Sequence, residues 1–342
     1  MDSNPSFGLP MTGQPMAGMN APMLMPPVDN TPADTPVAMP PMDPPVLTPP
    51  MDDMMNPPMD DMMNPPMDDT MDDTMDDTMD DMMDDDVVIG DGMCCDDGNC
   101  LCHGPDPSGL TASEGPYNVD TYTVSEGCIY YPTDAEPPFA AVTVSDGFIG
   151  TGGCGIAQTG RWGPLYASWG IVTMIINTGG GDQPPTRGSK LGGGIEAFKA
   201  ENEDSGSPLY QKLAGRYGTS GFSMGGGGTT YASEDDPSLM TSVAIMPWGP
   251  TRGSVTVPTL VICGASDGIA SCTSHGTPYY GRLDNSVPKM RVTVSGGHNG
   301  QPSAGGSESG EMGLAFQKVF LEGDERWRPF LAGADSNDTN IQ

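Results

Sequence analysis

The chain has few basic residues. No lysine or arginine occurs before Arg161. The 342 residues include 13 lysines and arginines but 46 aspartates and glutamates. Half of the acids lie at or before Asp106, so residues 1–106 carry a formal charge of −23 and the rest of the chain carries −10. Nucleic acids and anionic lipids bind clusters of positive charge. We therefore expect no nucleic acid partner and no binding to an anionic membrane surface.

Long apolar runs are also missing from the sequence. A membrane-spanning helix needs about 20 consecutive apolar residues, and none of the runs here comes close, so we expect no transmembrane segment. The opening residues, MDSNPSFGLPM, lack the basic and apolar regions of a signal peptide. For an exported chain, we therefore expect either a different start or another export route.

Residues 1–88 lack the apolar side chains needed to build a core. They consist mainly of Met, Pro, Asp, Asn and Thr, with MDDMMNPP and MDDT repeated in tandem. Proline removes backbone donors and neighbouring aspartates repel one another, so burial cannot offset the entropy of folding. We predict a disordered, extended tether. The aspartates do not follow the ligand and glycine pattern of a dedicated calcium loop, which favours a solvated spacer.

Four of the eight cysteines, Cys94, Cys95, Cys100 and Cys102, fall in the run CCDDGNCLCH, within a cysteine-rich joint over residues 89–116. Zinc accepts cysteine and histidine ligands, but this spacing matches no standard pair of zinc knuckles. We therefore favour local disulfides over a metal site. Because disulfides persist in oxidising compartments, we expect a secreted or cell-surface tethered protein; the alternative is an intracellular protein with reduced thiols.

Residues 117–342 alternate short apolar runs with longer helical patterns. Buried parallel strands are apolar throughout, so this alternation predicts an α/β fold with a mostly parallel central sheet and helices on both faces. The predicted strands cover residues 127–131, 140–145, 172–176, 216–221, 243–246, 259–263 and 290–295. The predicted helices cover residues 161–169, 190–201, 224–233, 278–283 and 311–320.

The segment GFSMG, residues 221–225, has the pattern G-x-S-x-G between an apolar predicted strand and a helix start rich in small residues. In that context the serine lies on a sharp strand-to-helix turn, where side chains two residues before and after it would clash. The turn raises the hydroxyl above the sheet, and the helix N-terminus favours an anionic intermediate. We predict that Ser223 is a nucleophile; the alternative is a glycine-rich surface loop.

A serine hydroxyl is a poor nucleophile at neutral pH and needs a base. The chain has three histidines. His103 lies in the cysteine-rich joint and His275 in a polar loop, whereas His298 follows the predicted strand 290–295, from which a loop could reach the serine. We predict that His298 is the base; the alternative is a purely structural histidine.

The base in turn needs an acid that orients it. Asp267 follows the apolar segment PTLVICGAS, at the end of a predicted strand, whereas Asp284 falls at a helix end and is typical of a solvated charge. The resulting order of serine, aspartate and histidine along the chain is the one that α/β hydrolases use. We predict that Asp267 orients His298.

The oxyanion of a tetrahedral intermediate needs two hydrogen-bond donors. The Met224 N–H, next after the nucleophile, is the first candidate. The second lies in residues 146–150, the glycine-flanked loop DGFIG that follows the predicted strand 140–145. We predict that the Phe148 N–H is this donor and that its ring forms a wall for an acyl or aryl group. The alternative for Phe148 is an ordinary core residue.

The segments GFSMGGGG, WGPLYASWGIVTMIIN, MPWGP, PTLVICGASDGIA and SGGH together resemble the bacterial cutinase and polyester (PET) hydrolase group of the α/β-hydrolase superfamily. The resemblance spans about residues 127–331. It implies that Phe148, Trp248 and Ile269 line the substrate cleft. Met224 would line the cleft as well, next to Phe222. The acyl-transfer chemistry requires no metal and no organic cofactor.

The chain departs from this group at several positions. Phe222 stands where His or Trp is common, Asp146 replaces a proline, and Phe148 stands where tyrosine is frequent. Two cysteines in loops near the predicted cleft, Cys154 and Cys272, have no counterpart and could pair with each other or with Cys128. We expect these changes to affect specificity more than chemistry.

We therefore predict a monomeric serine carboxylic-ester hydrolase that acts through an acyl-enzyme. Its substrate is either a polymer, such as cutin or a synthetic polyester, or a small ester. In the second case the substrate is a short-chain acyl ester or a phospholipid sn-2 acetyl ester, as for a platelet-activating-factor-acetylhydrolase-like esterase. The alternative from another class is a surface interaction protein in which the acidic repeats are functional and the hydrolase domain is inert.

Overall fold

The computed structural model describes Cys94 and residues 100–107, 114–150, 152–154, 161–251, 253–299 and 307–337. All of these residues belong to one compact unit. The disordered tether predicted for residues 1–88 lies outside the described residues. None of the described helices is long and apolar enough to cross a lipid bilayer.

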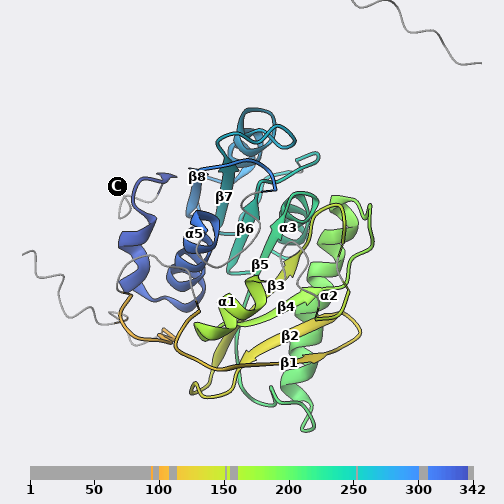
Figure 1. Ribbon diagram of the computed structural model, residues 1–342, viewed down its shortest axis with the longest axis vertical. Coiled ribbons are helices and arrows are strands. Elements are labelled where there is room, and N and C mark those ends of the chain that lie inside the picture. The colour runs from red at the N-terminus through yellow and green to blue at the C-terminus, as the bar shows by residue number, and fades with distance from the viewer. Residues whose placement is uncertain are drawn as a thin grey trace, which may run out of the picture. The chain divides into compact units, whose positions relative to one another are not determined.

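The described residues contain a nine-stranded sheet in the order β1-β2-β4-β3-β5-β6-β7-β8-β9 (Figure 1). Strands β3 to β8 run parallel to one another, whereas β1 pairs antiparallel with β2, β2 with β4, and β9 with β8. The strands are β1 (Val119–Thr123), β2 (Gly127–Pro132), β3 (Phe139–Ser145), β4 (Val172–Ile176), β5 (Leu213–Phe222), β6 (Thr241–Ile245), β7 (Thr259–Gly264), β8 (Lys289–Val294) and β9 (Asp335–Ser336).

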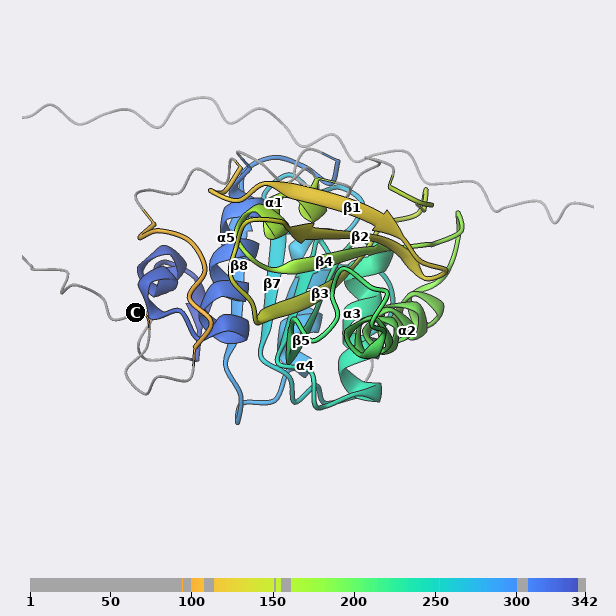
Figure 2. The same cartoon turned by 90° about the horizontal axis from the view of Figure 1, so that it is seen from below.

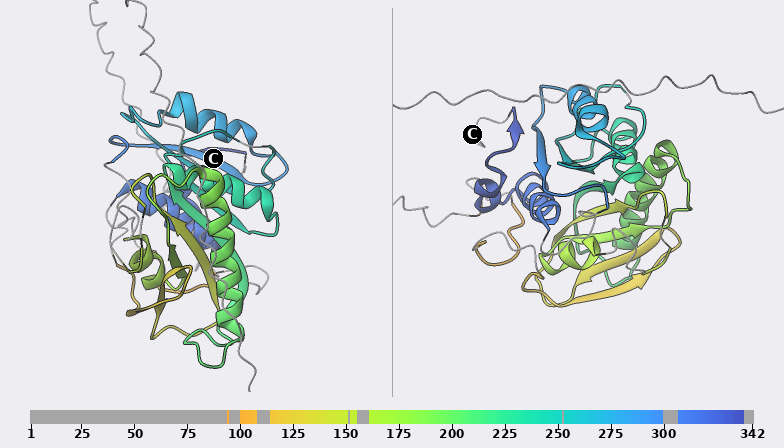
Figure 3. Two further views of the ribbon diagram at one scale, coloured as in Figure 1. Left: turned by 90° about the vertical axis from the view of Figure 1, so that its right-hand side faces the viewer. Right: turned by 45° about the horizontal axis from the view of Figure 1, so that its top comes forward.

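Helices cover both faces of the sheet, so the predicted α/β architecture is confirmed (Figures 2 and 3). One core packs α1 (Trp162–Ser168) and α5 (Glu308–Gln317) against the sheet. The other packs α2 (Pro184–Glu203), α3 (Met224–Asp235) and α4 (Thr277–Arg282) on the opposite face. Shorter helical turns cover Cys272–Gly276, Lys318–Glu322 and Glu325–Leu331.

All seven predicted strands are present, but the sequence missed β1 and β9. Both are edge strands: β1 is partly exposed and β9 has two residues, so neither has the apolar run of a buried strand. Helix α2 begins at Pro184, six residues before the predicted start at Lys190. Its first turn, PPTRGS, resembles a loop in composition, although proline is well tolerated at the start of a helix.

Three disulfides join described residues: Cys94–Cys102, Cys128–Cys154 and Cys263–Cys272. The first joins two cysteines of the run that predicted local disulfides, and the Sγ atom of Cys100 lies within 4.8 Å of both. The alternative pairing of Cys154 with Cys128 is confirmed. The pairing of Cys154 with Cys272 is wrong, because Cys272 lies in the turn that follows β7, with its Cα 5.2 Å from that of Cys263.

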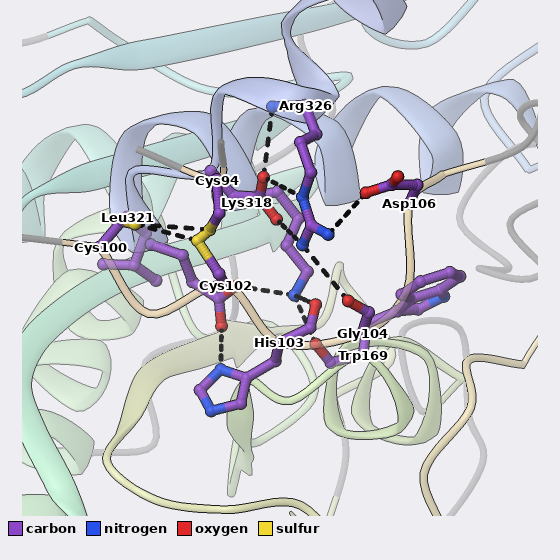
Figure 4. The surroundings of a disulfide bond; sticks show 12 residues. Cys94, Cys100, Cys102, His103, Gly104, Asp106, Trp169, Lys318, Leu321 and Arg326 are labelled. Atoms are coloured by element: carbon purple, nitrogen blue, oxygen red, sulfur yellow. Dashed lines mark hydrogen bonds and ion pairs between the residues drawn. A yellow bond between two sulfur atoms is a disulfide. The ribbon is translucent and has the colours of Figure 1, made fainter. Parts of the chain in front are cut away.

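The segment around His103 packs against the C-terminal helical turns through a buried ionic cluster (Figure 4). The Glu322 carboxylate lies 2.6 Å from the Lys318 Nζ and 2.9 Å from the His103 Nδ1. The Lys318 ammonium also donates to the carbonyls of His103 and Trp169. At the surface, Arg326 pairs with Asp106 at 2.8 Å. The segment before the sheet is therefore part of the folded unit.

The charge of Glu322 should make folding stability depend on pH. Burial by itself raises the pKa of this carboxyl, but Lys318 and His103 outweigh it and hold the pKa below the ordinary 4.5. A lowered pKa in the folded state contributes stability above pH 4.5 that is lost as pH falls through the folded value. Glu322→Gln should therefore cost about 3–5 kcal/mol at neutral pH, and the difference in Tm from the wild type should narrow below pH 4.5.

The control for this prediction is Glu196→Gln, which removes the exposed pair with Lys199. Exposed pairs contribute little, so its thermal unfolding should follow the wild type at every pH. Equal Tm values for Glu322→Gln and the wild type at neutral pH would contradict the assignment of the cluster.

Candidate active site

Ser223 lies between the end of β5 and the start of α3, with φ 55° and ψ −116°. A non-glycine residue with positive φ is strained, and such strain is typical of a functional turn. The flanking glycines are required by space: a Cβ on Gly221 would lie 2.3 Å from the Gly225 carbonyl oxygen, and a Cβ on Gly225 would lie 2.3 Å from that of Ser145. The turn predicted from G-x-S-x-G is present.

The structure brings together the three residues predicted as nucleophile, base and acid. The His298 Nε2 lies 2.9 Å from the Ser223 Oγ, and the His298 Nδ1 lies 2.7 Å from the Asp267 Oδ2. All three side chains are buried. A carboxylate can only accept, so Nδ1 carries the proton and Nε2 is left to accept from the serine hydroxyl. This arrangement can activate a hydroxyl for attack on a carbonyl carbon.

The three side chains reach the site from loops at the carboxyl ends of β5, β7 and β8, as the parallel sheet requires. The acid is fixed by its own loop, because the Asp267 Oδ1 accepts from the amides of Ile269 and Ala270 at 2.8 and 2.7 Å. On the other side, Glu308 at the start of α5 accepts from the Ser295 N and Oγ, just before the histidine loop. No local pattern in the sequence marked Glu308.

The competing candidates lie outside this chain of hydrogen bonds. His103 belongs to the buried cluster with Glu322, and the His275 ring stacks on Trp248 with centroids 6.4 Å apart. Asp284 is partly exposed, and hydrogen bonds from Ser286 lower the pKa of its carboxyl.

The loop after β3 carries Phe148, and the buried Arg187 of α2 holds that loop. Its guanidinium donates to the carbonyls of Asp146 at 2.8 Å and Gly179 at 3.3 Å. Burial lowers the pKa of Arg187, whereas nearby carboxylates raise it. The Gly181 N–H also donates to the Phe148 carbonyl. Sequence reasoning missed Arg187, because a buried arginine on a helix has no local signature.

A pocket of about 500 Å³ opens over the Ser223 hydroxyl. All five residues predicted to bind substrate line it: Phe148, Phe222, Met224, Trp248 and Ile269. The Phe222 ring packs against the His298 imidazole, with centroids 4.9 Å apart.

Sequence reasoning missed two residues of the pocket, Ile149 and Asn299. Each directly follows a predicted site residue in the sequence, and this position could have indicated that it lies at the pocket. The exposed fraction of Phe148 is 64%, of Ile149 66% and of Ile269 57%, which makes the rim apolar and open. The alternative that Phe148 is a core residue is therefore wrong.

The close packing of the serine turn predicts an asymmetric response to alanine. Gly225→Ala places a methyl group 2.3 Å from the Ser145 carbonyl and 2.6 Å from the Asp146 carbonyl, and should cost about 1–3 kcal/mol of unfolding free energy. The control, Gly192→Ala in α2, places its Cβ in open space and should leave stability unchanged or raise it by up to ~1 kcal/mol. Chemical denaturation of both variants tests this. Equal stabilities would refute the packing argument.

Comparisons with known proteins agree with this geometry. A family model described as PET hydrolase-like matches residues 95–342. The bis(hydroxyethyl) terephthalate hydrolase of Streptomyces coelicolor is 31% identical over 66% of this chain and 74% of its own length. Cutinase 1 of Thermobifida cellulosilytica is 32% identical over 67% of this chain and 89% of its own. A cutinase of Thermobifida fusca is 32% identical over 67% of this chain and 78% of its own length.

Proposed function

The chain belongs to the PET hydrolase-like family and is a carboxylic ester hydrolase, and from that premise we propose that it cleaves hydrophobic polyesters or acyl esters through a covalent acyl-enzyme. The observation that carries this proposal is the hydrogen-bond chain from Ser223 through His298 to Asp267 at an apolar pocket. The relatives named as cutinases and as a bis(hydroxyethyl) terephthalate hydrolase support the choice of substrate class.

The proposed reaction has two halves. In the first, the Ser223 Oγ attacks the ester carbonyl while His298 takes the hydroxyl proton, and the imidazolium returns that proton to the departing alcohol. In the second, a water molecule gives a proton to His298 and attacks the acyl-serine, which releases the carboxylic acid and restores the serine hydroxyl. Asp267 keeps the imidazole oriented and stabilises its charged form in both halves.

Two backbone N–H groups are proposed to stabilise the oxyanion, those of Met224 and Phe148. Met224 is the first residue of α3, so its amide belongs to the N-terminus of that helix. The Phe148 amide lies in the loop that Arg187 holds through the Asp146 carbonyl. Both donors therefore belong to backbone that packing fixes before the substrate arrives.

The character of the pocket favours a hydrophobic chain as substrate. Its walls are mostly aromatic and aliphatic, and its rim exposes Phe148, Ile149 and Ile269. An open apolar rim can bury surface against a polymer, which a small soluble ester does not provide. A small-ester hydrolase is the second candidate. Turnover on a polyester film, compared with turnover of a soluble ester, separates the two.

The described disulfides fit an extracellular protein. We also propose that residues 1–88 form a passive tether ahead of the cysteine-rich segment and that residues 117–342 are the catalytic domain.

Replacement of the nucleophile tests the mechanism. Ser223→Ala should lower kcat for a p-nitrophenyl ester on the order of 10⁶-fold, because no acyl-enzyme can form. A serine-reactive phosphonate should label Ser223 in the wild type and leave the variant unlabelled, as peptide mapping can show. The control, Ser238→Ala on an exposed turn, should keep full activity. Wild-type turnover by a folded Ser223→Ala variant would disprove the mechanism.

Replacement of a rim residue tests the substrate class. Ile149→Ser should lower turnover on a polyester film roughly fivefold, because about 1 kcal/mol of apolar burial against the film is lost. Turnover of a soluble short-chain ester should not change. Tyr210→Ser is the matched control, since Tyr210 is an exposed apolar side chain outside the pocket. Equal losses on film and soluble ester, or no loss on film, would favour the small-ester candidate.

A further inference from the structure

The loop that carries the acid is closed at its base by a disulfide. Cys263 belongs to β7, and Cys272 is the first residue of the helical turn Cys272–Gly276, nine residues further along the chain. Asp267 and Ile269 lie between them. The side chain that orients the base and a side chain of the pocket rim therefore belong to one covalently closed loop.

The turn after the disulfide is built around the sulfur atoms. A Cβ on Gly276 would lie 2.3 Å from the Cys263 Sγ and 3.2 Å from the Cys272 Sγ. Gly276 is therefore needed for space at this contact. Cys263 is 1% exposed, so its sulfur lies in the core at the end of β7.

The two halves of the loop are held differently. The first half is bonded to the end of β8 and to the chain just after it: the Ala265 N–H donates to the Val294 carbonyl and the Ser266 N–H to the Gly296 carbonyl, both at 2.9 Å. In the second half, the amides of Ile269 and Ala270 bond to the Asp267 carboxylate itself. The carboxylate and these amides therefore move together, and the disulfide ties this half to β7.

The chain on the other side of the disulfide also contacts a residue of the pocket. Three residues after Cys272, the His275 ring stacks on Trp248, which lines the pocket. The turn that joins Cys272 to His275 is short, and its start is capped by Ser271, whose Oγ accepts from the Ser274 N–H. Displacement of Cys272 would therefore disturb both the acid and a wall of the pocket.

We propose that Cys263 and Cys272 are positioning residues for the active site: their disulfide fixes the acid loop to β7, so that the Asp267 Oδ2 meets the His298 Nδ1. This inference rests on the proposed function, in which Asp267 orients the base. Without the bond, the second half of the loop gains freedom and the carboxylate spends less time in hydrogen-bond contact with the imidazole. The effect falls on the rate of the chemical step, because catalytic groups must be held in narrow geometry.

The experiment compares the variant C263A/C272S with C128A/C154S, which removes a different disulfide. The readouts are kcat and KM on a soluble p-nitrophenyl ester and the low-field proton resonance of the His298 Nδ1–H. We expect C263A/C272S to lower kcat by about 10- to 100-fold, with a smaller change in KM, and to broaden or lose the resonance. C128A/C154S should keep the resonance, whatever its thermal stability.

A second measurement applies if C263A/C272S does not fold. C128A/C154S is treated with tris(2-carboxyethyl)phosphine, which reduces a disulfide to two thiols as water supplies the protons and the oxygen of the phosphine oxide. The free thiols are then alkylated and mapped by mass spectrometry. Loss of kcat should follow alkylation of Cys272, not that of Cys94 or Cys102.

Unchanged kcat and an unchanged resonance, in C263A/C272S or in enzyme fully alkylated at Cys272, would overturn the proposal. Failure of the proposed function is distinguishable: a folded wild type that neither hydrolyses esters nor reacts with a serine-directed phosphonate refutes the function itself. An active, labelled wild type with an unaffected C263A/C272S variant refutes only the positioning role.

Discussion

The strained backbone of Ser223 is the constraint on which the site depends. Its positive φ turns the chain sharply from β5 into α3, and this turn is possible because Gly221 and Gly225 carry no side chains that would collide with backbone carbonyls. The same close approach brings the helix start beside the end of β3, from which the loop of Phe148 departs. The same packing thus positions the proposed nucleophile and the two proposed oxyanion donors.

Much of the fold follows from local patterns. The central strands are buried over their whole length and consist mainly of apolar residues because both faces are covered, and these apolar runs made the strands recognisable in the sequence. The three candidate site residues were predictable because each closely follows a predicted strand and because Ser223 lies in a glycine pattern with a steric cause. The edge strands β1 and β9 and the start of α2 were missed, since exposure, short length or proline hides their periodicity.

The missed parts of the site depend on contacts between distant residues. Arg187 lies on α2, 41 positions from the carbonyl of Asp146 that it holds, and Glu308 holds Ser295 from the next helix. The partner of Cys272 depends on how the turn after β7 folds back over Cys263. No spacing rule in one sequence reports such contacts. These long-range contacts hold the loops around the site, whereas the sequence motifs already indicate its reactive atoms.

The buried contact between the His103 segment and the C-terminal turns bears on where this protein can be cut. The sheet starts only at Val119, yet Lys318 and Glu322 have no exposed side-chain surface while His103 covers them. A fragment trimmed to the first strand would leave an ammonium and a carboxylate at a newly opened surface and would lose the Cys94–Cys102 bond. A fragment that keeps these contacts therefore begins no later than Cys94, well upstream of the first element of regular structure.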